Sequence, residues 1–203
     1  MKQYPAVATI EFGDIAAGAA ATDAMLKKAP IAFFRCGTIT DGRYLTLIGG
    51  TTASVEESFG EGLRHAAGHV LDSVVLLDVD HRLYDAVQGA RRGRGAGALA
   101  VIETGTVSAS IRGAEAALKG TPVELLEIRL GDSGLAGRGL ALYQGPLHDV
   151  EAAVQLAVAQ ARRGTVRVSS RIIAAPYEAL VSQLEHGTGF ATALTVALEG
   201  EHL

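Results

Sequence analysis

The sequence has no tryptophan, only one cysteine and few aromatic residues. Because Cys36 is the single cysteine, an intrachain disulfide is excluded and no disulfide framework can hold the fold together. Aromatic residues make up 5% of the 203 residues, whereas apolar residues make up 48%. The core must therefore consist mainly of small aliphatic side chains, which allow helices and strands to pack closely.

A strong net charge and long apolar segments are also missing. The formal net charge is -4, which provides no overall basic field to attract nucleic acid or anionic lipid. No apolar run approaches the roughly 20 residues that span a bilayer, and Met1–Ile10 lacks the regions of a signal peptide. We therefore expect a cytoplasmic protein without nucleic-acid or membrane partners, whose apolar surface is buried within the fold or between subunits.

The dominant feature that is present is an internal repeat. Residues 6–15, AVATIEFGDI, match residues 98–107, ALAVIETGTV, at an offset of 92. At this offset, ten of the 29 positions between Ala6 and Phe34 are identical. The offset then grows to 95 between Arg35 and Gly42, which predicts a longer loop there in the second copy. Two registers kept in phase over this distance indicate a duplicated domain.

Each copy predicts the order strand, helix, strand, strand, helix, strand, which is that of a ferredoxin-like α+β domain with an antiparallel-containing sheet. We expect a first domain at 1–89, a flexible basic Gly/Arg linker at 90–97, and a second domain at 98–203 with a C-terminal tail from residue 187. In the first copy, the expected strands are Ala6–Phe12, Ile31–Arg35, Tyr44–Ile48 and Val74–Val79. The expected helices run from Asp14 to about Lys28, from Thr51 or Thr52 to about Ala67, and briefly after His81.

The two copies resemble the shell-protein domains of bacterial microcompartments. Domains of that family open with a strand of the form A-[IVL]-x-x-[IVL]-E, and the helix that follows ends in D-A-x-x-K. The matching residues are Ala6–Glu11 with Asp23–Lys27 in the first copy, and Ala98–Glu103 with Glu115–Lys119 in the second. The resemblance covers almost all of residues 6–186 and identifies the chain as a tandem-domain (BMC-T type) shell protein.

The resemblance implies a structural function and no enzymatic activity. Two fused domains imply a homotrimer that mimics a six-domain ring, tiles a shell facet beside other shell proteins, and surrounds a central pore for small polar metabolites. Encapsulated enzymes are further possible partners, and the shell of the microcompartment is the implied location. The pore-lining residues are Gly37, Thr38, Ile39, Thr40, Asp41 and Gly42 in the first copy, and Gly131, Asp132, Ser133, Gly134, Leu135, Ala136 and Gly137 in the second. The implied contacts at the tile edge are Lys27, Lys119 and His81.

No cofactor or metal is expected. Some tandem shell proteins carry a cysteine in the first pore loop, where three copies bind an iron–sulfur cluster, but Thr40 occupies that position here. Cys36 is interpreted as a small buried apolar side chain. His65 and His69 lie four residues apart after Glu61, a spacing that zinc ligands use, but a solvated polar face explains it better.

Two other interpretations stay open. Arg91, Arg92 and Arg94 in the linker suggest a solvated connector, with contact to cargo or a neighbour as the alternative. For the whole chain, the alternative is a ligand-binding or regulatory oligomer of duplicated ferredoxin-like domains. An enzyme ranks third, because no acid, base and nucleophile recur in a credible arrangement.

Overall fold

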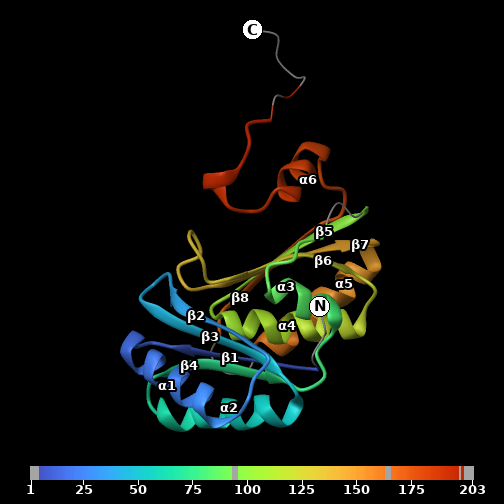
Figure 1. Ribbon diagram of the computed structural model, residues 1–203. Coiled ribbons are helices and arrows are strands. Elements are labelled where there is room, and N and C mark those ends of the chain that lie inside the picture. Colours follow the sequence, from blue (N-terminus) through green and yellow to red (C-terminus); the bar gives the residue numbers. More distant parts are fainter. Residues whose placement is uncertain (1–4, 93–95, 163–165, 197, 199–203) are drawn as a thin grey trace.

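The computed structural model describes residues 5–92, 96–162, 166–196 and 198, and it contains two similar α+β units (Figure 1). In the first unit, four antiparallel strands are ordered β2-β3-β1-β4, and two helices cover one face of the sheet. The elements are β1 (Ala6–Phe12), α1 (Ile15–Lys28), β2 (Phe33–Ile39), β3 (Arg43–Gly50), α2 (Thr52–His65), β4 (Val70–Leu76) and the short α3 (His81–Val87).

The second unit repeats this topology with the strand order β6-β7-β5-β8. Its elements are β5 (Ala98–Thr104), α4 (Val107–Gly120), β6 (Glu124–Leu130), β7 (Gly139–Gly145), α5 (Leu147–Ala161), β8 (Val168–Ile173) and α6 (Glu178–Glu185). A single 3-10 turn at Phe190–Thr192 follows in the C-terminal segment. The duplicated ferredoxin-like α+β fold predicted from the repeat is confirmed.

Local signals start the helices where the sequence predicts. The Asp14 carboxylate accepts a hydrogen bond from the backbone N of Ala17 at 2.7 Å, which caps α1. Thr51 and Thr106 cap α2 and α4 in the same way. In the second unit, α4 and α5 approach closely at Gly113, where an added Cβ would lie 2.9 Å from the Ala157 carbonyl oxygen. Small residues therefore permit the tight helix packing that the composition indicates.

Several predicted boundaries were wrong. The second strand runs on to Ile39, so most of the segment expected to form a turn is extended and only Thr40–Gly42 connects it to β3. The fourth strand begins at Val70, four residues earlier than predicted, and ends at Leu76. Helix α2 ends at His65, so His69 lies in the turn before β4 and does not share a helical face with His65.

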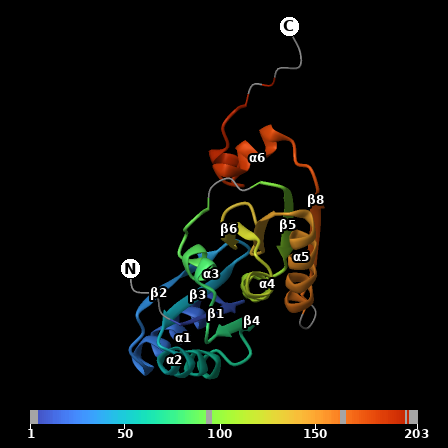
Figure 2. The same cartoon turned by 90° about the vertical axis from the view of Figure 1, so that its right-hand side faces the viewer.

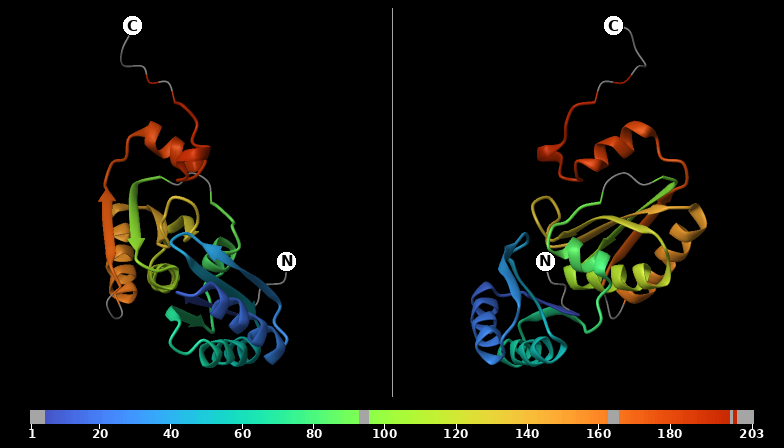
Figure 3. Two further views of the ribbon diagram at one scale, coloured as in Figure 1. Left: turned by 90° about the vertical axis from the view of Figure 1, so that its left-hand side faces the viewer. Right: turned by 45° about the vertical axis from the view of Figure 1, so that its right-hand side comes forward.

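The two units pack through α4, which lies between the two sheets (Figures 1 and 2). On one side it covers its own sheet, and on the other it packs against the open face of the first sheet through Val7, Leu45 and Leu47. Ten of the 14 residues of α4 are buried, against four of 14 in its counterpart α1. Figure 3 shows α1 and α2 as an outer layer of the first unit. The two copies therefore have the same fold, but α4 is covered on both sides whereas α1 is covered only by its own unit in the described part of the chain.

Candidate pore loops and subunit interface

The two loops predicted to line a pore lie side by side. The β2–β3 loop is Thr40–Gly42, and the β6–β7 loop runs from 131 to 138, so the second is the longer, as predicted. The Thr40 hydroxyl donates to the carbonyl oxygen of Gly131 at 2.8 Å and accepts from the backbone N of Gly137 at 2.8 Å. The backbone N of Thr40 also donates to Gly131 O at 3.1 Å. Thr40 thus joins both ends of the second loop to the first.

A half-buried cluster of charges holds the second loop. The guanidinium of Arg129 donates to the Asp132 carboxylate at 2.9 Å and to the Ser133 carbonyl oxygen at 2.6 Å. Arg129 also donates to the hydroxyl of Thr188 at 3.1 Å, which links the loop to the C-terminal segment. Within the loop, Ala136 adopts a positive φ of 48°, a conformation that is unusual for a residue with a side chain. The loop is therefore a defined turn held by specific contacts.

Replacing Thr40 by valine should loosen the second loop. Valine keeps the shape of threonine but loses the hydroxyl that donates to Gly131 O and accepts from Gly137 N. The expected cost is about 1–2 kcal/mol of unfolding free energy, together with faster proteolysis between residues 131 and 137. Thr38→Val is the matched control, since Thr38 is exposed on β2, two residues before Thr40. Equal protease sensitivity of the two variants would contradict this role of Thr40.

The predicted pore residues Gly37, Thr38 and Ile39 lie on β2, just before the first loop. Beside them is a hollow of about 200 Å³ between the two units, lined also by Arg35, Cys36, Leu130 and Asp132. Cys36 is exposed, so its interpretation as a buried side chain was wrong. Strand β2 forms the edge of its sheet, so it has a neighbouring strand on one side only. The remaining predicted residues Asp41, Gly42, Gly134 and Leu135 lie within the two loops.

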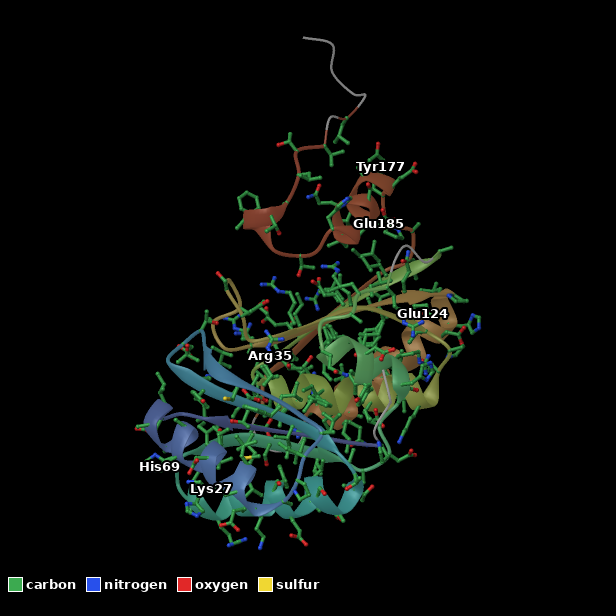
Figure 4. All side chains as sticks on the ribbon, in the orientation of Figure 1. Lys27, Arg35, His69, Glu124, Tyr177 and Glu185 are labelled. Atoms are coloured by element: carbon green, nitrogen blue, oxygen red, sulfur yellow. The ribbon has the colours of Figure 1, made fainter. Side chains whose placement is uncertain are left out.

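The three predicted edge residues occupy different environments. Lys27 is three-quarters exposed and pairs with Asp23 one turn earlier, on the helical layer of the first unit (Figure 4). Lys119 pairs with Glu115 at 2.8 Å and also contacts the Asp78 carbonyl oxygen, which belongs to the first unit. The His81 side chain is mostly exposed at the start of α3. Lys119 thus contributes to the contact between units, whereas Lys27 has no partner outside its own helix among the described residues.

A buried carboxylate lies beneath the N-terminus of α4. Oε1 of Glu11 accepts from the backbone N of Ser108 at 2.5 Å, while Oε2 has no hydrogen-bond partner among the described residues. The nearest cationic atom is Nη1 of Arg43, 3.9 Å from Oε2. Burial raises the pKa of Glu11 to about 7, against the lowering effect of the N–H groups of α4. Arg43 also donates to the carbonyl oxygens of Gly105 and Gly137, so this cluster ties the unit contact to the loops.

Sequence reasoning missed Glu11 and Arg43 as parts of the contact between units. A signal was present, because Glu11 matches Glu103 at the offset of 92 and Arg43 matches Arg138 at the offset of 95. In the second copy, Arg138 pairs with Glu103 at 3.0 Å, but Glu103 is one-third exposed and accepts from no helix N-terminus among the described residues. Among the described residues, the second copy therefore has the same pair of side chains but lacks the helix N-terminus that Glu11 meets in the first copy.

Helix α1 likewise exposes the residues that α4 buries. Ile15 is 43% exposed and Leu26 is 37% exposed, whereas their counterparts Val107 and Leu118 are 0% and 2% exposed. The open face of the second sheet carries Leu99, Leu126 and Leu142, which α6 covers in part through Leu184. Each chain therefore leaves α1 uncovered and the open face of the second sheet only partly covered. These two surfaces are the counterparts of α4 and the open face of the first sheet, which pack together inside the chain.

The other candidate sites are accounted for by contacts within the chain. Asp80 caps α3 through the backbone N of Arg82 at 2.8 Å, and its own N donates to Glu115 of the other unit. Arg91 pairs with Glu127 at 2.6 Å and Arg92 with Glu124 at 3.4 Å, while both arginines remain exposed, as the solvated interpretation expects. Arg94 lies outside the described residues.

His65 pairs with Glu61 at 3.3 Å, and no group of three or more metal-ligating side chains occurs among the described residues. None of the described helices has the length and apolar character needed to cross a membrane.

Comparison with known proteins agrees with the repeat. A family described as BMC domain matches residues 6–78 and again residues 98–176. The bacterial microcompartment shell protein PduT of Citrobacter freundii is 29% identical over 182 residues, which cover 90% of this chain and 98% of that protein. The crystal structure of a microcompartment protein from Desulfitobacterium hafniense superposes with a TM-score of 0.76 at 31% identity, covering 88% of this chain and 98% of the other.

A more distant structure shares the fold alone. It is a double ringed trimeric shell protein from the RMM microcompartment, with a TM-score of 0.56 and 13% identity, covering 77% of this chain and 82% of the other.

Proposed function

Because this chain belongs to the BMC domain family and is a shell protein of a bacterial microcompartment, we propose that three copies form a ring of six domains around a central pore. The observation that carries the proposal is the difference between α1 and α4. Inside the chain, the open face of the first sheet covers α4. Repeating that contact between chains places the open face of the second sheet on α1 of the next copy. A head-to-tail contact of this kind closes into a ring.

Polar groups support the same arrangement. At the offset of 92, Ser108 corresponds to Ala16 and Gly105 to Gly13. Glu103 would therefore accept from the backbone N of Ala16 in the next copy, as Glu11 accepts from that of Ser108. Arg138 would donate to the Gly13 carbonyl oxygen in the next copy, as Arg43 donates to that of Gly105. The exposed pair Arg138–Glu103 is then completed by assembly.

The same ring would bring the two loops toward its axis. Each chain holds its two loops side by side through Thr40, so three copies would alternate six loops around one opening. Backbone N–H groups and small polar side chains such as Ser133 suit passage of polar metabolites. We propose that the protein acts as a structural conduit without catalytic activity, beside other shell proteins and around encapsulated enzymes. Lys27 and His81, exposed on the outside of the unit, would contact neighbouring tiles.

The mass of the assembly tests the ring. We expect light scattering after gel filtration to give three times the 21.0 kDa of the chain, because α1 and the second sheet each need a partner surface. Electron microscopy of concentrated protein should then show sheets or tubes built from these trimers. A stable monomer in dilute buffer would rule out the ring, whereas a trimer that never forms sheets would limit the proposal to the ring itself.

A further inference from the structure

The segment after α6 has no counterpart in the first copy and lies beyond the matched family domain, which ends at residue 176. Residues 187–198 contain no charged side chain. Phe190 is 95% exposed, and Leu194 and Leu198 are each 62% exposed. Figure 1 shows this segment leaving the body of the second unit beside α6. A chain that exposes so many apolar side chains in one segment presents a surface for a partner.

This segment leaves α6 in the same way that the linker leaves α3. After α3, the backbone N of Gly89 donates to Ala86 O at 2.9 Å, and Gly89 has a φ of 98°. After α6, the backbone N of Gly187 donates to Leu184 O at 3.1 Å, and Gly187 has a φ of 121°. Both helices thus end in a glycine with a positive φ two residues after the last helical residue. The two following segments therefore start in equivalent directions.

The path of the linker beyond this point is visible in the structure. It runs along β6, the edge strand of the next unit, where the backbone N of Arg92 donates to the Leu126 carbonyl oxygen at 3.3 Å. Arg91 pairs with Glu127 of the same strand at 2.6 Å, and Arg92 with Glu124 at 3.4 Å. The linker therefore covers an edge that would otherwise expose unpaired backbone groups.

We propose that the C-terminal segment 187–196 of each copy runs along β2, the exposed edge strand of the next copy in the ring, as the linker runs along β6. This inference rests on the ring proposed above. In that ring, α6 stands at the boundary between chains, as α3 stands at the boundary between units. The edge strand that follows this boundary is β2 of the next copy.

The chemistry of the two edges fits this assignment. The linker offers Arg91 and Arg92 to a strand that carries two glutamates. Strand β2 instead begins with two aromatic residues, Phe33 and Phe34, of which Phe34 is 51% exposed. The uncharged segment would bring Phe190 and Leu194 to this apolar edge. After the 3-10 turn at Phe190–Thr192 the chain becomes extended at Ala193. An extended segment that adds to a sheet edge gains backbone hydrogen bonds, while apolar side chains select the strand.

Hydrogen–deuterium exchange of trimers tests the proposal. We compare the full chain with a chain that ends at Gly189, which keeps the bonds of Thr188 to Glu127 and Arg129. A peptide covering residues 31–39 should exchange roughly fivefold faster in the shortened trimer, because its outward amides lose their acceptors. A peptide covering β6 is the internal control, since the linker covers that edge in both proteins. The full-length variant Phe190→Ser should show the same effect if truncation dissociates the ring.

A monomeric variant shows whose edge is covered. In Ile15→Asp/Leu26→Asp, the segment has no neighbouring β2, so residues 31–39 should exchange as fast as in the shortened chain. Protection that persists in this monomer would mean that the segment covers its own chain, and the proposal would be wrong. A trimer whose β2 exchange ignores both truncation and Phe190→Ser would also overturn it and leave the ring intact. A wild-type chain that is monomeric would remove the ring and this inference together.

Discussion

Replacing Ile15 and Leu26 by aspartate should turn the trimer into monomers without unfolding the chain. Both side chains lie on α1 and are 43% and 37% exposed in the single chain, so their removal costs the isolated fold little. Their counterparts Val107 and Leu118 are fully buried against the first sheet. Full burial of such a side chain is worth about 1.5–3 kcal/mol, of which assembly contributes only the part that the single chain leaves exposed, and a buried unpaired carboxylate costs more. The double substitution therefore removes the favourable contact and adds a penalty at all three chain boundaries.

Gel filtration with light scattering measures the outcome, and circular dichroism checks that the monomers stay folded. Leu156→Asp is the matched control, because Leu156 is 39% exposed on α5, away from the contact formed by α4 with the first sheet. This control should remain a trimer. Persistence of the trimer in the double variant would place the chain boundary on another surface of the molecule.

Replacing Glu11 by glutamine should make the chain increasingly more stable than the wild type as pH rises from 5 to 8. The folded chain raises the pKa of Glu11 to about 7 from 4.5, so the protonated form is favoured by folding. The stability that this group contributes is complete below pH 4.5 and is lost as pH rises through 7. The difference amounts to roughly 3 kcal/mol. Glutamine keeps an oxygen for the backbone N of Ser108 and cannot ionise.

Denaturant unfolding at several pH values, in the background of the monomeric double variant, measures this effect. The monomer is used because, in the proposed trimer, Glu103 would lie at the N-terminus of α1 in the next copy, as Glu11 lies at the N-terminus of α4. The effects of the two glutamates on stability would then overlap. Glu103→Gln is the control there, since Glu103 is one-third exposed and paired with Arg138. Parallel stability curves for the wild-type residue and Glu11→Gln would show that Glu11 is ionised at no cost in the folded chain, contrary to the expectation. Asp72, which Arg112 partly neutralises at 3.4 Å, is the nearby acid that contributes to the raised pKa.

The repeat made the fold predictable, because strand and helix signals agreed in both copies. The cap at Asp14 and the stop before Pro30 fixed α1 almost to the residue. The fourth strand was misplaced because Asp72 and Ser73 interrupt its apolar pattern. Asp72 is tolerated in β4 because it accepts from the Thr106 hydroxyl at 2.5 Å and pairs with Arg112, and both partners come from the other unit. Partners from the other unit do not change the local alternation of apolar and polar residues, so the sequence pattern does not reveal them.

The loops were located by sequence, but their contacts were not. Glycines and short polar residues predicted turns at 36–42 and 130–137; the second matches the structure closely, whereas the first is reduced to 40–42 because β2 runs on to Ile39. The bonding of Thr40 to both ends of the second loop depends on how the two units pack, and no spacing rule encodes that distance. The difference in burial between α1 and α4 depends on what covers each helix, so neither helix sequence shows it on its own.

The linker that joins the two units makes the proposed ring less sensitive to dilution. It makes one of the two kinds of domain contact intramolecular, so the first sheet meets α4 at an effective concentration that no dilution lowers. In the proposed ring, only the three contacts between chains compete with the loss of translational freedom. The concentration of assembled rings then varies with the third power of the free chain concentration. For a ring of six separate domains, it would vary with the sixth power of the free domain concentration. A fused chain should therefore complete its rings at concentrations at which separate domains of equal contact strength remain dispersed.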